Sequence, residues 1–333
     1  MRGFLTDPTA PAGLRLTGAL PEPEPADGEF LMAVHAYALN RDELNLIRRR
    51  PDGWRPGQDV AGTVLRAAAA GTGPAAGTRV LARLEELGWA ERAAVPVHSA
   101  AVLEDAVTFA QAATLPIAGI TALRALRQGG PLLGADVLVT GATGGVGQFA
   151  VQLAAAAGAR VTAHVSRPER AGAALALGAR HTVTTLAEAA PHGPYQLVLD
   201  GIGGPVLTDA VRLLAPGATA VLYGNVAGPS QLSIGDFYAQ GWNARLVGLI
   251  SADPTPGATG GEAGPGMAAD LATLVRLVAD GRLTPHTTLT ADWTRTPDAL
   301  TALARRDIRG KAVLTLPPAA TDPALDPALD RRL

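Results

Sequence analysis

A glycine-rich segment near the middle of the sequence has the residue types and spacing of a phosphate-binding turn. The apolar run Val137–Val139 leads into it, and the helix-forming run Gly145–Ala157 follows. Glycines let the backbone approach a ligand closely, and N–H groups at a helix N-terminus attract negative charge. Ala142 replaces the first glycine of the G-x-G-x-x-G fingerprint, so Gly141 is expected to supply the tight turn. The segment predicts binding of a dinucleotide pyrophosphate. The residues expected at the pyrophosphate are Gly144, Gly145, Val146 and Gly147.

The segment that follows the next strand bears on which dinucleotide is bound. An acidic residue about 20 residues past the fingerprint would hold the ribose 2′-hydroxyl of NAD. The sequence there reads Ser166-Arg167-Pro168-Glu169-Arg170. Because guanidinium groups bind phosphate in a bidentate way, the segment favours NADPH, with its 2′-phosphate held by Ser166, Arg167 and Arg170. Ser166 and Glu169 also fit a capping box, which would give Glu169 a structural role. Ser166 could then be either the helix cap or a ligand of the 2′-phosphate.

The runs around the turn alternate between strand-like and helix-like patterns. This alternation predicts an α/β fold, a Rossmann doubly wound parallel sheet with helices on both faces. Ligands of such sheets bind at the carboxyl ends of the strands. The runs are Asp136–Thr140, Gly145–Ala157, Arg160–Val165, Pro168–Leu177, His181–Val183, Gln196–Asp200, Pro205–Leu214, Ala218–Tyr223 and Arg245–Ile250.

The N-terminal third of the chain has a different character. Short apolar runs separated by Gly and Pro predict a β-rich, barrel-like domain with one helix at Asp42–Arg50. Further along, the Gly- and Pro-rich segment Asp253–Gly266 is expected to be a mobile loop and a candidate lid. The expected division is a first part of the catalytic domain at 1–107, a Rossmann domain at 108–245, the end of the Rossmann sheet with a return to the catalytic domain at 246–316, and a disordered tail at 317–333.

The composition argues against several other classes of function. With 28 basic and 30 acidic residues, the chain has no excess positive charge for nucleic-acid binding. The chain has no cysteine, which excludes disulfides and thiolate metal sites, and no two histidines are spaced as a metal-binding pair. No apolar run approaches the ~20 residues of a membrane span. Asp7 and Pro8 interrupt the N-terminus before a signal peptide could form. We expect a cytoplasmic protein with no metal and no membrane partner.

Several motifs, in order along the chain, resemble those of the quinone oxidoreductase and enoyl reductase branch of the medium-chain dehydrogenase/reductase superfamily, whose members do not use zinc. The resemblance extends to about Leu316 and implies a β-rich GroES-like catalytic domain split around the Rossmann domain. Zinc-containing relatives have Gly-His-Glu where this chain has Gly57-Gln58-Asp59, so it implies a metal-free member. The motifs are Ala38–Glu43, Pro56–Gly62, Ala113–Ala122, Thr140–Gly147, Leu199–Gly204, Tyr223–Asn225 and Arg309–Val313.

The resemblance also implies a reaction and the residues that serve it. The reaction is hydride transfer from NADPH to a small molecule, either a quinone or a C=C bond conjugated to a carbonyl. Asn40 would contact both cofactor and substrate, and the proton would come from water or from Tyr37, Tyr223 or Tyr238. The further cofactor-binding residues that it implies are Thr121, Gly201, Ile202, Gly224, Asn225 and Lys311.

Two tyrosines that relatives often have are absent from this chain. The first follows the Asn-x-x-acid helix in relatives, and this chain has Arg48–Trp54 there. The second lies near the 2′-phosphate in relatives, and this chain has Thr184–Thr185 there. The arginines at 48–50 could attract an anionic substrate or simply form a solvated helix end. The missing tyrosines leave one alternative from another class: a non-catalytic NADPH-binding sensor or structural relative.

The final strand of the Rossmann sheet is expected to lie at its edge. This run, Arg245–Ile250, has no charge after Arg245 and no proline to block pairing. Exposed apolar edges are usually covered. In relatives of this kind the same strand of a second subunit covers the edge, so we expect a homodimer whose sheet continues across the interface.

Overall fold

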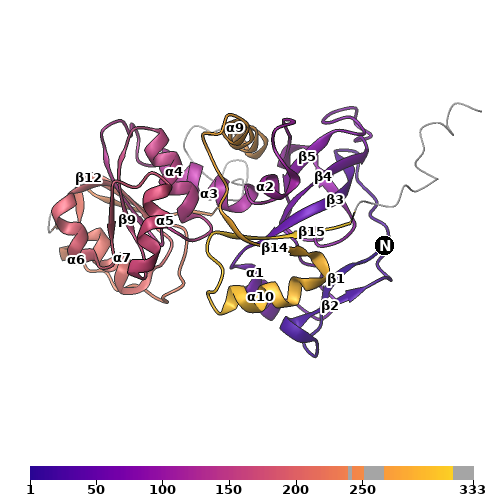
Figure 1. Ribbon diagram of the computed structural model, residues 1–333, viewed down its shortest axis with the longest axis horizontal. Helices are drawn as coiled ribbons and strands as arrows, with labels where there is room; N and C mark the ends of the chain where they lie inside the picture. Colours follow the sequence, from indigo (N-terminus) through magenta and orange to yellow (C-terminus); the bar gives the residue numbers. More distant parts are fainter. Residues whose placement is uncertain (239–241, 251–265, 318–333) are drawn as a thin grey trace, which may run out of the picture. The chain divides into compact units, whose positions relative to one another are not determined.

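The computed structural model describes residues 1–238, 242–250 and 266–317 (Figure 1). The chain divides into two compact units. Unit 1 comprises Met1–Ile117, Asp253–Asp280 and Thr287–Leu333, and unit 2 comprises Ala118–Ala252 and Gly281–His286. Apart from Gly266 and Pro317, the expected loop at Asp253–Gly266 and the expected tail at 317–333 lie outside the described residues. No helix in the described ranges is long and apolar enough to cross a membrane.

Unit 1 is built on a mostly antiparallel sheet with β3 at its centre. The strand order is β14-β15-β3-β4-β5-β7, and β6 also pairs with β3. β15 pairs antiparallel with β3, with Thr315 opposite Ala36, whereas β14 runs parallel to β15. Beside it, β1 and β2 form a two-stranded sheet. The strands are β1 (Gly3–Thr6), β2 (Leu14–Thr17), β3 (Glu29–Leu39), β4 (Asp59–Arg66), β5 (Arg79–Arg83), β6 (Arg92–Pro96), β7 (Ala100–Val102), β14 (Thr287–Asp292) and β15 (Lys311–Thr315).

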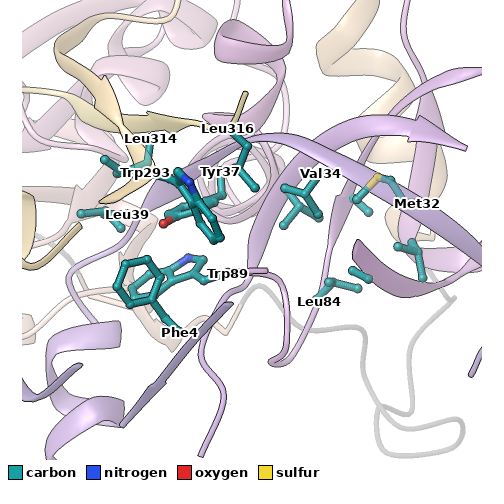
Figure 2. Close-up of a cluster of buried hydrophobic side chains, with 14 of the residues drawn as sticks. Phe4, Met32, Val34, Tyr37, Leu39, Leu84, Trp89, Trp293, Leu314 and Leu316 are labelled. Atoms are coloured by element: carbon teal, nitrogen blue, oxygen red, sulfur yellow. The ribbon is translucent and has the colours of Figure 1, made fainter. Parts of the chain in front are cut away.

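The core of unit 1 is rich in aromatic side chains from distant parts of the sequence (Figure 2). Tyr37 stacks on Trp89 with ring centroids 5.4 Å apart, and Phe4 meets Trp293 edge-on at 5.8 Å. All four are at most 2% exposed. Large aromatic surfaces of this kind contribute much of a core's stability, and they tie the N-terminal strand to the C-terminal segment.

The described part of unit 1 contains four α-helices, of which α2 and α9 contact strands of the sheet. α2 contacts β3 and β4. Phe109 in α2 stacks on His35 with ring centroids 4.6 Å apart, and the guanidinium of Arg79 lies 4.8 Å from the centroid of the Phe109 ring. These contacts keep residues 108–117 with unit 1, so the observed boundary follows Ile117 rather than residue 107. The helices are α1 (Glu43–Arg49), α2 (Phe109–Ala113), α9 (Met267–Ala279) and α10 (Thr296–Ala304).

Unit 2 confirms the predicted Rossmann fold. Its six strands are all parallel, in the order β10-β9-β8-β11-β12-β13. The chain moves outward from β8 in one direction and from β11 in the other, so the topological switch point lies between these two strands. The strands are β8 (Asp136–Thr140), β9 (Arg160–His164), β10 (His181–Val183), β11 (Tyr195–Asp200), β12 (Leu214–Leu222) and β13 (Arg245–Gly248).

The helices of unit 2 follow the strands in the alternation that the sequence predicts. α4 contacts β8 and β9, and α7 contacts β11 and β12. The helices are α3 (Pro116–Arg127, which begins in unit 1), α4 (Gly147–Ala156), α5 (Ala171–Ala176), α6 (Leu186–Ala189), α7 (Gly204–Val211) and α8 (Ile234–Tyr238). Val137–Val139 and Leu197–Leu199 are fully buried, as a sheet covered on both faces requires.

Candidate cofactor-binding site

The turn after β8 is shaped by glycines at the switch point of the sheet. Gly141 adopts a φ of +62°, a left-handed conformation that favours glycine. Its carbonyl accepts a hydrogen bond from Gly144 N at 2.8 Å, and Ala142 N donates to the carbonyl of His164 at the end of β9. Gly141 therefore makes the tight turn in place of the missing glycine at position 142, as the sequence predicts.

Gly147 begins α4 directly against this turn. A Cβ atom on Gly147 would lie 2.3 Å from the carbonyl oxygen of Gly141 and 2.8 Å from Cα of Ala142. Both neighbours are backbone atoms, so they cannot move aside as a flexible side chain would. Only glycine allows α4 to start this close to the end of β8.

The start of α4 presents N–H groups that have no partner in the described chain. Val146 occupies the N-cap position and makes no side-chain cap. Within the described residues, the N–H groups of Gly145, Val146 and Gly147 donate to no acceptor. Consecutive free N–H groups at the N-terminus of a ten-residue helix form a concave donor site for an anion. The four residues predicted at the pyrophosphate thus lie together in a cradle that fits it.

The loop after β9 carries the residues predicted at the 2′-phosphate. Ser166 and Arg167 are exposed, and Arg170 is partly exposed. The predicted capping box is wrong: a 3-10 turn begins at Pro168, with Arg167 as its extended N-cap residue and no side-chain cap. Ser166 therefore lies one residue too early to cap, and Glu169 does not have the structural role that the sequence assigned to it.

Thr140 and Asp200, the last residues of β8 and β11, form a hydrogen bond across the switch point. Thr140 Oγ1 donates to Asp200 Oδ1 at 2.5 Å, and Gly203 N donates to Asp200 Oδ2 at 2.7 Å. Burial raises the pKa of Asp200, and these hydrogen bonds oppose the rise. The family motifs implied Gly201 and Ile202 at this strand end, but not the Asp200 carboxylate. The polar residues that end two strands of the predicted parallel sheet are the signal that could have revealed it.

The loops after β11 and β12 lie against each other backbone to backbone. A Cβ atom on Gly224 would lie 2.4 Å from the carbonyl oxygen of Gly201. Ala227 N donates to the carbonyl of Ile202 at 2.8 Å, and a Cβ atom on Gly203 would lie 2.6 Å from Oδ1 of Asn225. The structure thus brings together Gly201, Ile202, Gly224 and Asn225, all of which the sequence assigned to the cofactor.

Tyr223, the first residue after β12, adds a polar atom to this edge. Its hydroxyl is buried and has no hydrogen-bond partner in the described structure. Burial and the nearby charge of Asp200 raise the pKa of Tyr223. A buried donor without an acceptor is unfavourable, so this hydroxyl is available to a group that binds beside it.

In unit 1, a buried polar cluster joins Asn40 to Lys311. Lys311 Nζ donates to Asn40 Oδ1 at 2.5 Å and to Asp59 Oδ2 at 3.1 Å, and Asn40 Nδ2 donates to Asp59 Oδ2 at 2.8 Å. Lys311 is 2% exposed and Asp59 is fully buried. The structure thus assembles two of the predicted site residues around an aspartate that the sequence analysis did not assign to the site.

The hydrogen bonds of Asp59 in this cluster decide whether Gln58-Asp59 could bind a zinc ion. Oδ1 of Asp59 accepts from Ile117 N at 2.9 Å, and its other oxygen accepts from Lys311 and Asn40. An ammonium therefore already neutralises the carboxylate, and Gln58-Asp59 does not fit a zinc ion. In the described ranges, no three His, Asp or Glu side chains gather as a metal site would require.

The remaining predicted residues are Thr121 and Tyr238 in unit 2 and Tyr37 in unit 1. Thr121 is 5% exposed within α3, whereas Tyr238 is 67% exposed at the end of α8. Tyr37 lies in the core of unit 1 with its hydroxyl 2.6 Å from Thr296 Oγ1, and burial raises its pKa. The catalytic roles of Tyr37 and Tyr238 stay predictions, and the burial of Tyr37 does not favour its role.

The fold and the glycine cradle define a dinucleotide-binding protein with a second, β-rich unit, and comparisons with known proteins identify its family. Residues 145–256 match the family of zinc-binding dehydrogenases. The chain is 34% identical over 305 residues to a spectinabilin polyketide synthase system protein of Streptomyces orinoci, covering 88% of this chain. It is 30% identical over 237 residues to acryloyl-coenzyme A reductase of Metallosphaera sedula, covering 62% of this chain and 71% of that enzyme.

Solved structures agree with this result. A mycobacterial protein complexed with NADPH is 26% identical with a TM-score of 0.81, over 95% of this chain and 100% of that one. A quinone oxidoreductase of Pseudomonas syringae is 26% identical with a TM-score of 0.79, over 94% and 99%. The chain belongs to the medium-chain dehydrogenase/reductase superfamily. It spans only 13%, 5% and 8% of the three Streptomyces polyketide synthases that it matches.

Proposed function

We propose that this protein is a cytoplasmic, NADPH-dependent reductase of C=C bonds conjugated to a carbonyl, and that its substrate is an enoyl thioester. One observation carries the proposal: the free N–H groups of residues 145–147 at the switch point of a parallel sheet. Such a cradle suits a pyrophosphate, and the neighbouring strand ends lie where the rest of a dinucleotide would extend.

The residues of unit 2 fit the parts of a nicotinamide dinucleotide in order. The turn at Gly144–Gly147 would hold the pyrophosphate, and the paired loops at Gly201–Ile202 and Gly224–Asn225 would hold the nicotinamide half. When bound, the cofactor supplies the hydride. The protein orients the cofactor. Glycine at 201 and 224 lets the two loops lie close enough together to hold the nicotinamide half.

Two observations favour NADPH over NADH. Arg167 and Arg170 lie in the loop after β9, next to the predicted ribose position, and guanidinium groups bind phosphate well. The mycobacterial neighbour, which covers nearly the whole chain, was solved with NADPH. Because the capping box is absent, Glu169 is not engaged there and competes as a ligand for the 2′-hydroxyl of NADH.

Two relatives support the choice of an enoyl thioester. Polyketide synthases are named among the relatives, and acryloyl-coenzyme A reductase is named for reducing a conjugated thioester. A quinone remains the second candidate because of the Pseudomonas syringae neighbour. In either case charge develops on a carbonyl oxygen, and hydrogen-bond donors would stabilise it. Asn40 would orient the substrate from a position fixed by Lys311 and Asp59.

The test is turnover with NADPH deuterated at the transferred position. An enoyl thioester, a quinone and an alkanal without a C=C bond are each mixed with the purified protein, and the products are analysed by mass spectrometry. We expect deuterium at the β-carbon of the saturated thioester and no reduction of the alkanal. Turnover of the quinone alone would reassign the substrate. Tight NADPH binding without any turnover would favour the sensor alternative.

A further inference from the structure

A groove of about 550 Å³ lies in unit 1 where three segments meet: the 3-10 turn η1 (Pro11–Gly13), α1 and α10. α10 packs against η1. A Cβ atom on Gly13, whose φ is +74°, would lie 3.0 Å from Cγ2 of Ile47 in α1. None of the residues assigned above to cofactor or catalysis lines this groove.

The floor of the groove is apolar and continuous with the core. Ile47 and Leu300 are 8% and 1% exposed and belong to the core of unit 1, and Leu44 packs against them. Ala304, the last residue of α10, is exposed at one side. An apolar chain that lay on these residues would be withdrawn from water.

The rim carries positive charge without compensation. Arg48, Arg50 and Arg305 are three of the twelve lining residues, and none of the twelve is acidic. Arg48 donates to Asn45 Oδ1, and Arg50 lies 5.4 Å from the ring of Trp54, but neither contact neutralises a guanidinium. In the described part of the chain, none of the three arginines forms an ion pair. The whole chain has a net charge of −2, so this concentration of positive charge is local.

We propose that this groove binds a small amphipathic anion. Its alkyl or acyl chain lies along Leu44, Ile47 and Leu300, and its carboxylate or phosphate head group contacts the three arginines. The size favours a small molecule over a protein partner. Small-molecule sites have volumes of roughly 300–1,000 Å³. A stable protein interface uses roughly 20–30 residues a side, whereas twelve residues line this groove.

The proposal is tested by calorimetric titration of the whole chain, independently of any turnover. The probes are dodecanoate and dodecyl phosphate below their micelle concentrations, with butanoate, inorganic phosphate and dodecyltrimethylammonium for comparison. We expect both dodecyl anions to bind, with affinity rising by up to about fourfold per added methylene. The relative affinities of the carboxylate and the phosphate identify the preferred head group.

Variants separate the contribution of the rim from that of the floor. The pair Arg48→Gln and Arg305→Gln should weaken dodecanoate binding by tenfold or more, because both charge-assisted contacts are lost. Arg282→Gln, which removes an exposed arginine of unit 2, is the matched control and should change nothing. Ala304→Phe should block the groove without lowering the melting temperature, because residue 304 is exposed.

Three results would overturn the proposal. The cationic dodecyl probe could bind as tightly as the anions, in which case the arginines select nothing. Inorganic phosphate could bind as tightly as dodecyl phosphate, in which case the floor contributes nothing. Binding could also survive both the arginine pair and Ala304→Phe, in which case it occurs elsewhere.

Discussion

Arg167 and Arg170 should decide which nicotinamide cofactor binds. Replacing both with Gln should raise the Kd for NADPH by tenfold or more and leave that for NADH nearly unchanged, because charge-assisted contacts to the 2′-phosphate contribute ~1.5–3 kcal/mol each. Fluorescence titration of both cofactors measures this. Arg180→Gln, an exposed arginine of the same unit, is the control. Equal losses for the two cofactors would show that the arginines do not contact the phosphate.

Glu43 should make stability depend on pH. The side chain is fully buried, and its Oε2 accepts from Asn40 N at 2.7 Å. Its Oε1 has no partner in the described structure. Burial raises the pKa of Glu43, and the negative charge of Asp42 adds to the rise. The native state therefore keeps a proton at pH values where the unfolded chain has lost it.

The contribution of Glu43 to the free energy of unfolding therefore decreases with rising pH. The decrease begins above 4.5, the ordinary pKa of glutamate, and continues up to the raised pKa of Glu43 in the native state. Glu43→Gln removes this dependence, so the variant should gain stability relative to the wild type as the pH increases. Urea unfolding of both proteins across the range from about pH 4 to pH 8 measures the difference. A difference that stays constant with pH would mean that Glu43 does not titrate in this range.

At the scale of the element, the contact between α4 and the turn after β8 requires glycine at 147. Gly147→Ala should weaken cofactor binding by more than tenfold and destabilise the protein by about 1–3 kcal/mol, because the new Cβ would overlap backbone atoms. Gly172→Ala is the matched control: it lies in α5 with no atom within 4 Å of an added Cβ, so it should stabilise slightly. Unchanged NADPH affinity in Gly147→Ala would contradict the proposed cradle.

The elements of unit 2 could be predicted well because their signals are local. The buried run at β8, the glycines and the apolar helix adjoin one another in sequence, so spacing alone predicted the cradle. The capping box failed because it assumed that the helix starts after Ser166, whereas the chain makes a 3-10 turn from Pro168.

The cluster in unit 1 could not be predicted in the same way. It joins Asn40, Asp59 and Lys311 across as many as 271 residues, and no periodicity connects positions so far apart. The family resemblance indicated Asn40 and Lys311 individually. That they share the Asp59 carboxylate follows only from the pairing of β3 with β4 and β15.

For the molecule as a whole, β13 remains a candidate dimer interface. Among the described strands it pairs only with β12, and Leu246 and Ile250 are 39% and 80% exposed. The N–H of Leu249 donates to the carbonyl of Leu222 in β12. Because successive N–H groups along a strand point in opposite directions, the N–H of Leu246 points away from β12. We propose that a second copy of β13 pairs with this edge and extends the sheet.

Leu246→Pro should therefore yield monomers, because proline removes an outward N–H from the pairing edge. Leu246→Ala keeps that N–H and should stay largely dimeric. Sedimentation velocity at micromolar concentration distinguishes the two variants. A monomeric wild type would mean that the edge is not used for assembly.

The pairing of β3 with β15 also sets an order of events during synthesis. Thr315 lies opposite Ala36, so 315 − 36 = 279 residues must be translated before this register can form. At ~5–20 residues per second, the wait is roughly 14–56 s. Most of unit 2 emerges from the ribosome within that interval and can fold first. β6 pairs with Glu29–Ala33 of β3 early, so only the Ala36–Leu39 part of this edge stays open on the nascent chain. We expect chaperones to engage that part until the C-terminal strand arrives.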